Sequence, residues 1–531
     1  MPPPAPLSLE FSLPPGAAQR LLKSQRLAGL RAARPRARPL RLTWFDTEDG
    51  MLSAQGRLIE VSPGTPGSAG GPARRGARQQ LRQLLPEAGL AWCPGTQAAV
   101  LAEARLTRAT PDAGAAGLGE GTKLVALAAA DGRTHDIAVT LDGAAASLSL
   151  AEGLLRANDA REPFARLLIS APPDTLFALA AQLSREVPLL PAPPLAEAAR
   201  ALARGEPPRP PRRGAPTLDR AMRVEDGLVH VLLHLVSCLL SLAPALALAP
   251  ALAGQESVEA VHQARVTLRR LRSALSVWRD AIGGEAARRL AAGLRDMAGR
   301  LGPVRDRDVL LGGMLAELEA DLAAEASAAR AGLALVGEAL AAERRAAAGA
   351  LAAWIDSAAF SDLVLALLAE TTGRGWRRGA DAARLHLLEA PLPGFAARVL
   401  RRQGRRLLKQ ADRLDGVPVA VLHAIRLSAK RLRYAGEFFA PLFPAKPAKR
   451  YLRRLARLQD ALGIVNDGSV AGRLVRALPG SGLADAAGAA SARACAEGAL
   501  DGYAAARAHT ARSDAGAAWR KFRRAAAFWA D

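Results

Sequence analysis

The chain has 531 residues, of which half are hydrophobic and 4% are aromatic, and its formal net charge is +22. This length accommodates two or three domains with their own cores, and the abundance of alanine, leucine and arginine favours packed helices. Cys93, Cys238 and Cys495 sit far apart without metal-ligand or redox spacing, which weakly indicates a reducing compartment. We expect no metal site and no cofactor. The start MPPPAPLSLEF has no basic stretch followed by an apolar one, which argues against a secretory signal and favours the cytoplasm.

The first 205 residues show a mixed pattern of strands and helices that predicts an α+β domain. Strand-like runs occur at 41–47, 123–128, 135–141 and 164–170, and helical stretches occur at 17–30 and 174–185. Asp131-Gly132 lies between the second and third runs and predicts a hairpin turn. The Gly/Ser/Pro-rich piece from Ser62 to Pro72 predicts a loop.

A proline-rich linker at 206–216 separates this domain from the rest, 217–531, which we expect to be helical. Thr217 is placed to cap the first helix. The run from Gly227 to Gly254 contains no charged residue and is long enough to cross a bilayer. Its internal histidines and prolines favour a buried core helix that stops near Pro244, so a membrane span is the less favoured alternative.

The helical part contains the same basic pattern twice, 161 residues apart. VHQARVTLRRLR begins at Val261 and LHAIRLSAKRLR begins at Leu422, and no gap is needed to align them. The same offset relates LGPVRDRDV (301–309) to LGIVNDGSV (462–470). The repeat predicts a duplicated unit, with two helical bundles related by a pseudo-twofold axis, one for each copy.

In each copy the basic residues follow one another at spacings of three and four, which keeps them on one face of a helix. Apolar residues occupy the neighbouring stripe and are expected in the core. Like charges so close together repel one another unless an anion compensates them, although a solvated helix surface would give the same pattern. Residues 391–460 add further charge, with 17 Lys or Arg against 4 Asp or Glu. Such concentration indicates a polyanionic partner.

The repeated LGPVRD and LGIVND segments predict a helix end, a short turn and a new helix start. Asp306 and Asp467 are then placed to cap the next helix, or to orient the repeated arginines by pairing with them.

On these motifs the second domain resembles the CHAD family. The resemblance implies two four-helix bundles flanking a basic cleft that binds inorganic polyphosphate, often at polyphosphate granules. The residues that match the family's basic motifs, together with the added basic helix, are expected to bind polyphosphate: His262, Arg265, Arg269, Arg270, Arg272, His423, Arg426, Lys430, Arg431, Arg433, Arg402, Arg405, Arg406, Lys409 and Arg454.

The first domain resembles a degenerate CYTH domain, the antiparallel barrel of triphosphate tunnel enzymes, in RLTWFDTEDGML and VTLDG. The family's Glu-x-Glu-x-Lys signature, which would hold a metal and a phosphate, is not kept. The positions that match the family's functional residues are Pro6, Ser8 and Glu10 on the first strand, Glu60 and Ser62 on GRLIEVS, and Arg166 and Leu168 on a later strand.

The sequence therefore predicts a cytoplasmic polyphosphate-binding protein without catalytic residues. Triphosphate or polyphosphate hydrolysis in the first domain is one alternative, but it needs grouped carboxylates to hold a metal. Nucleic-acid binding is the other alternative, since the same positive charges would attract any phosphate backbone. Proteins that bind single strands, however, usually add aromatic side chains on which the bases stack.

Overall fold

The structure is a computed structural model of the chain, which divides into two compact units. The first contains Met1–Pro211, Val236–Pro244 and Trp354–Gly375, and the second contains Arg212–Leu235, Ala245–Ala353 and Trp376–Asp531. The residues that the structure describes are 6–63, 76–84, 93–119, 121–205, 216–250, 255–323, 326–410, 412–414, 416–478 and 487–529.

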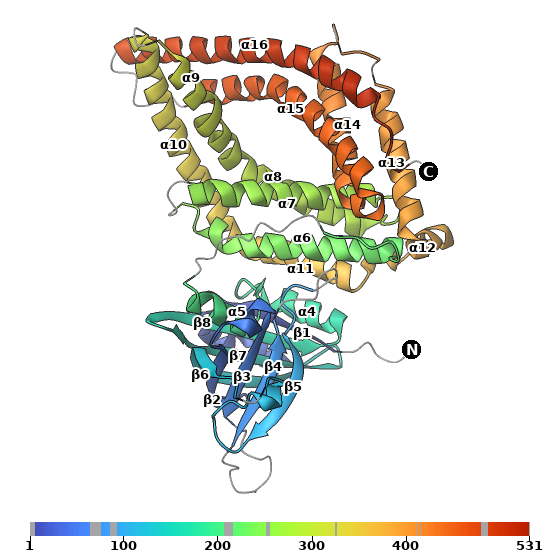
Figure 1. Cartoon of the computed structure of the whole chain (residues 1–531). Coiled ribbons are helices and arrows are strands. Elements are labelled where there is room, and N and C mark those ends of the chain that lie inside the picture. The colour runs from blue at the N-terminus through green and yellow to red at the C-terminus, as the bar shows by residue number, and fades with distance from the viewer. Residues whose placement is uncertain are drawn as a thin grey trace. The chain divides into compact units, whose positions relative to one another are not determined.

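The first unit contains an antiparallel sheet of nine strands in the order β5-β4-β3-β2-β6-β7-β8-β1-β9 (Figure 1). The backbone N–H of Glu10 donates to the carbonyl of Gly95 at 2.6 Å, and Leu9 pairs with Thr96, so β1 also meets the segment before β5. The sheet thus curves around an interior. Its strands are β1 (Leu7–Ser12), β2 (Arg36–Thr47), β3 (Arg57–Pro63), β4 (Ala77–Gln83), β5 (Ala99–Leu106), β6 (Leu124–Leu141), β7 (Ala144–Ala157), β8 (Ala160–Ala171) and β9 (Leu190–Pro191).

The alternation of side chains along the strands creates that interior. In β2, Arg38, Leu40, Leu42 and Trp44 all line one enclosed cavity, as expected when every second side chain points to the same face of a strand. The antiparallel sheet confirms the predicted fold class of this region. The helices of the unit include α1 (Ala17–Lys23), α2 (Gln25–Leu30), α3 (Met51–Ala54), α4 (Pro173–Leu183), α5 (Leu195–Ala203) and α11 (Ala358–Thr372).

The predicted hairpin turn at Asp131-Gly132 is wrong, because β6 runs without interruption from Leu124 to Leu141. Gly132 pairs directly with Gly153 of β7. A Cβ atom built on Gly132 would lie 2.1 Å from the carbonyl oxygen of Glu152, so glycine is required here by the close approach of two strands.

The second unit is helical, as predicted, and α6 has residues in both units. In Figure 1, α7 and α8 run along one side of this unit and α15 and α16 along the opposite side. Its elements are α6 (Val224–Ala247), α7 (Gln255–Val277), α8 (Glu285–Val309), the π-helix η2 (Leu310–Leu315), α9 (Ala316–Asp321), α10 (Ser327–Ile355), α12 (Ala382–Glu389), α13 (Leu392–Leu408), α14 (Val419–Phe439), α15 (Ala445–Arg476) and α16 (Ala487–Arg523).

Three local predictions for the helical part need correction. The segment 301–309 is not a turn, since α8 continues through Pro303 to Val309, and 462–470 lies within α15. Asp306 therefore caps no helix. The first helix begins at Val224, so Thr217 is not its cap, and it continues through Pro244 to Ala247. The grouping of these helices into two four-helix bundles stays a prediction.

The apolar run predicted at Gly227 to Gly254 lies mostly in α6. Within the described part of the chain, α6 is long and apolar enough to cross a membrane, and α10 with α11 passes the same test only as one bent pair. However, 72% of the apolar window of α6 is buried inside the protein, as in the core helix of a globular domain.

The glycine pair in β6 and β7 gives a test of the sheet. We expect Gly153→Ala to destabilise the first unit by about 1–3 kcal/mol, because the added Cβ would lie 2.2 Å from the carbonyl oxygen of Asp131. Gly29→Ala is the control, since a Cβ in that helix meets nothing within 4 Å. Urea unfolding measures both, and a Gly153→Ala protein as stable as wild type would contradict the strand pairing.

Candidate functional site

The two repeated basic segments form α7 and α14, and each helix buries one side. The buried side of each carries its apolar residues, so the basic side remains accessible. The buried positions are Val261, Ala264, Leu268, Leu271 and Leu275 in α7, and Leu422, Ile425, Ala429 and Leu432 in α14.

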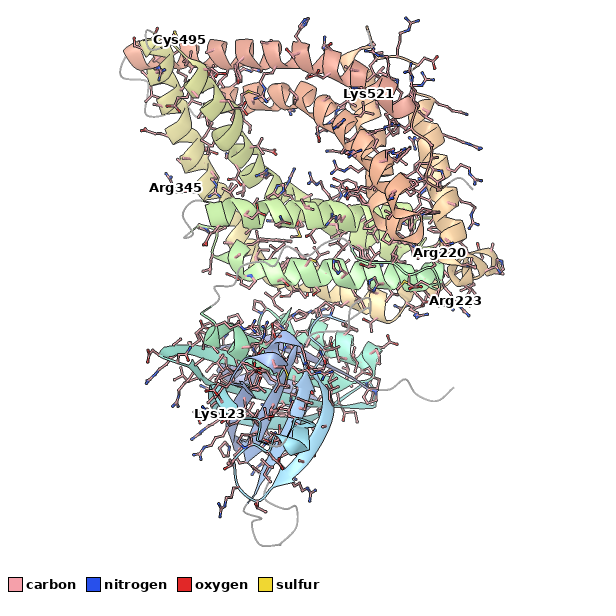
Figure 2. All side chains as sticks on the ribbon, in the orientation of Figure 1. Lys123, Arg220, Arg223, Arg345, Cys495 and Lys521 are labelled. Atoms are coloured by element: carbon pink, nitrogen blue, oxygen red, sulfur yellow. The ribbon has the colours of Figure 1, made fainter. Side chains whose placement is uncertain are left out.

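A cleft of about 580 Å³ lies between the two copies of the repeat. Helices α7, α8, α9, α14, α15 and α16 and the π-helix η2 contribute its walls. Figure 2 shows nitrogen-bearing side chains along α14 and α15. The charged and titratable residues that line the cleft are His262, Arg265, Arg269, Arg305, Asp306, Glu317, Arg426, Lys430 and Arg507.

Positive charge exceeds negative charge in this cleft by four. Its lining contains six arginine or lysine side chains and two carboxylates. Arg507 of α16 pairs with Glu317 of α9. The other carboxylate, on Asp306, is 4.0 Å from the guanidinium of Arg265, at the limit of an ion pair. Among the residues that line the cleft, cations therefore outnumber carboxylates.

Arg265 is half-buried and lies among other cations. Desolvation lowers the pKa of its guanidinium, the charges of Arg269, Arg305 and Arg272 act in the same direction, and Asp306 opposes them. The Nε atom of Arg269 is buried and has no hydrogen-bond partner among the described residues. Both features show that these two guanidinium groups are partly desolvated, which costs free energy unless opposite charge compensates them.

The aromatic core holds α7 and α14 in place next to the cleft. The ring of Trp278, fully buried at the end of α7, lies 5.1 Å from Phe439 and 6.0 Å from both Phe438 and Phe395. The indole Nε1 of Trp278 donates to the carbonyl of Val224 at 3.1 Å. Rigid packing of this kind fixes the two basic helices against their mutual repulsion.

Glu437 forms a second link between the two copies. Its carboxylate is 2.8 Å from Nε of Arg433 in α14 and 3.6 Å from Arg270 in α7. Arg433 also donates to Gln459 at 3.3 Å. Arg270 and Arg433 therefore engage an internal acid that bridges the helices, which gives both a structural role in this state.

The predicted binding residues thus separate into several groups. Arg272 and His423 are exposed and Arg454 is half-buried, and none of them lines the cleft. The side chain of Asp467 lies outside the described residues. The predicted residues that the structure brings together in the cleft are His262, Arg265, Arg269, Arg426 and Lys430, with Asp306 beside Arg265. A second set lines other cavities: Arg402, Arg405, Arg406, Lys409 and Arg431.

Sequence reasoning missed Arg305, Glu317 and Arg507. The offset of 161 residues pairs Arg305 with Asn466, so no repeated charge marked this position. Arg507 belongs to α16, which carries no copy of the motif. The π-helix Leu310–Leu315 was missed as well, and its Gly313 and Met314 line the cleft. Such π-bulges occur frequently at functional sites.

The first unit encloses a separate cavity of about 320 Å³ inside its sheet. Four arginines and two glutamates line it, and each arginine has a carboxylate nearby. Arg82 is 2.8 Å from Glu60 and Arg166 is 3.9 Å from Glu10, whereas Arg38 and Arg78 pair with Asp136 and Glu103 outside the lining. Among the described residues, no three His, Cys, Asp or Glu side chains form a group that could hold a metal. The positions aligned by the CYTH resemblance that line this cavity are Glu10, Glu60, Ser62, Arg166 and Leu168.

Glu10 gives the interior of the sheet a pH-dependent stability. Burial raises the pKa of its carboxyl to about 7, Arg166 and Arg82 act against this, and Glu60 adds to it. A pKa that is higher in the folded state than in the unfolded state favours folding with the acid protonated. The cost of ionisation therefore appears as the pH rises from about 4.5 to about 7, and is absent below that window.

We expect Glu10→Gln to remove this pH dependence. In wild type the free energy of unfolding should fall by up to about 3 kcal/mol between pH 4.5 and 7.5 on account of Glu10. The variant should not show this decrease in the free energy of unfolding. Its stability relative to wild type should therefore increase with pH. Glu48→Gln, at an exposed carboxylate, controls for the amide itself. If the difference in free energy of unfolding between the wild type and the Glu10→Gln variant were the same at every pH, this assignment would be contradicted.

Comparison with known proteins agrees with the predicted identity of the helical part. Residues 240–476 match the model of the CHAD domain family. No curated protein sequence matches the chain.

Three solved structures are similar in part. The CHAD domain from the plant Ricinus communis is 27% identical, with 59% of this chain and 96% of that one covered and a TM-score of 0.47. PptA from Streptomyces chartreusis is 21% identical, with 56% and 100% covered and a TM-score of 0.41.

The third structure is the putative adenylyl cyclase HpAC1 from Hippeastrum, described as having a dominant triphosphatase activity. It is 15% identical, with 34% and 87% covered and a TM-score of 0.24. The family match, the duplicated basic helices and the all-helical fold agree in one conclusion: residues 240–476 of this chain are a CHAD domain.

Proposed function

We propose that the helical unit binds inorganic polyphosphate in the cleft between α7 and α14. One observation carries the proposal, namely that six cations, five from the two copies of the repeat and Arg507 from α16, line the cleft against two carboxylates. A linear polyanion compensates several of these charges at once and releases its own counterions. The planar fork of arginine can hold two phosphate oxygens, so Arg265, Arg269, Arg305 and Arg426 suit this ligand.

The lining of the cleft favours polyphosphate over nucleic acid. Among the residues that line it, none is Phe, Tyr or Trp, and its apolar members are aliphatic. Proteins that bind single-stranded nucleic acid without sequence preference usually stack bases on aromatic side chains. Polyphosphate has no bases, so the lack of aromatic side chains in the cleft costs it no binding free energy. A protein of this kind would be recruited to polyphosphate granules, and it needs no catalytic residue to do so.

Charge reversal within the cleft tests the proposal against a matched control. We expect Arg305→Glu to weaken binding of long-chain polyphosphate on the order of tenfold, and to reduce the slope of log affinity against log salt by about 1. Arg295→Glu changes the same charge on the same helix, α8, at an exposed position outside the cleft. Binding should be measured by titration at several salt concentrations. Equal loss in both variants would mean that only the overall charge matters.

Competition between ligands tests the specificity. Single-stranded RNA of the same total charge should displace polyphosphate weakly, because the cleft offers its bases no stacking surface. We expect at least about a tenfold higher concentration of RNA to be needed for half displacement, given that stacking contributes about 1–3 kcal/mol per base where platforms exist. Displacement at equal concentrations would favour a nucleic-acid partner instead.

A further inference from the structure

A second basic surface lies on α13, outside the cleft. One side of α13 is buried through Phe395, Leu400 and Leu407. Its other side lines an open groove of about 440 Å³ with no residue but arginine and lysine, and α13 itself contains no acidic residue. We call this the α13 surface, and it consists of Arg398, Arg401, Arg402, Arg405, Arg406 and Lys409.

The α13 surface continues into a pocket of about 190 Å³ formed with the end of α7 and with α14. Polar groups that suit phosphate oxygens line it throughout, since Ser276, Ser428 and Gln403 accompany the arginines. The cations that line this pocket are Arg279, Arg402, Arg406 and Arg431.

One carboxylate partly compensates these cations. Asp280 lies 2.5 Å from Arg402 and 3.3 Å from Arg279. Its carboxyl is subject to opposing influences: burial would raise the pKa, but the hydrogen bond from Arg402 and the nearby guanidinium charges lower it overall. Arg406 and Arg431 form no ion pair within the described residues, so an excess of positive charge persists in the pocket as it does in the cleft.

The pocket and the cleft share no residue, although α14 contributes to both. Arg426 and Lys430 line the cleft, whereas Ser428 and Arg431 line the pocket. At 100° per residue, Arg431 is turned about 140° away from Arg426 around the helix. An anion bound at one site therefore contacts a different side of α14 from an anion bound at the other.

We propose that this pocket and the α13 surface form a second, independent site for short linear polyphosphate. The inference rests on the proposed function, because it assigns the same class of ligand to a different surface. An anionic membrane is less suited, since a helix that binds a membrane surface exposes apolar residues beside its basic ones, and the apolar side of α13 is buried in the core. Nucleic acid again lacks an aromatic platform among the lining residues.

The number of tripolyphosphate molecules bound by the full chain tests the inference. Titration calorimetry on the wild type should show two molecules of tripolyphosphate bound per chain. Arg406→Glu/Arg431→Glu should leave one equivalent, and Arg305→Glu/Lys430→Glu in the cleft should also leave one. Arg288→Glu/Arg295→Glu, a double charge reversal at exposed positions of α8, should keep both. Thermal unfolding of each variant verifies that it is folded.

The outcomes separate the two proposals. A single equivalent in wild type that survives Arg406→Glu/Arg431→Glu but not Arg305→Glu/Lys430→Glu would overturn the second site and leave the cleft intact. The reverse pattern would overturn the cleft and keep the second site. Protection of wild-type arginines from phenylglyoxal supplies a readout without any substitution: tripolyphosphate should protect Arg431 and Arg406 several-fold, and unchanged modification of both would also overturn the second site.

Discussion

The arrangement of the helical unit depends on cations being held close together against their repulsion. Arg265, Arg269 and Arg305 lie near enough for their charges to act on one another in a partly buried cleft. Coulomb repulsion of this kind is stronger there than in bulk water, because the surrounding protein screens it less. The folded core must therefore supply the stability that these charges remove. The aromatic cluster around Trp278 and the bridge through Glu437 do so beside the cleft.

The two units of the chain differ in how far carboxylates compensate the cations that line their cavities. Inside the sheet, each arginine that lines the cavity lies within 4 Å of a carboxylate, as Arg82 does of Glu60 and Arg166 of Glu10. Such a cavity has little electrostatic need for a ligand. In the helical cleft, cations outnumber carboxylates by four. An excess of one sign in a cleft concentrates ligands of the other sign and accelerates their arrival. The proposed function is assigned to the helical unit for this reason.

The repeat in the sequence predicted the two helices that matter most, because residues at spacings of three and four share one helix face whatever the tertiary structure. It could not separate residues that line the cleft from those that bind an internal acid. Arg270 and Arg433 follow the same spacing as their neighbours, and only the fold brings Glu437 to them. Arg305 and Arg507 reach the cleft from other helices without any repeated motif. The errors were local: Asp131-Gly132 resembles a turn but meets a second glycine across the sheet, and Pro303 is tolerated within α8.

A structure of the chain with a bound oligophosphate tests the central claim most directly. At saturating ligand, phosphate density should lie between Arg265 and Arg269 on α7 and Arg426 and Lys430 on α14. Guanidinium and ammonium nitrogens should approach the phosphate oxygens to about 2.7–2.9 Å. An empty cleft under the same conditions, with density only elsewhere on the molecule, would contradict the account.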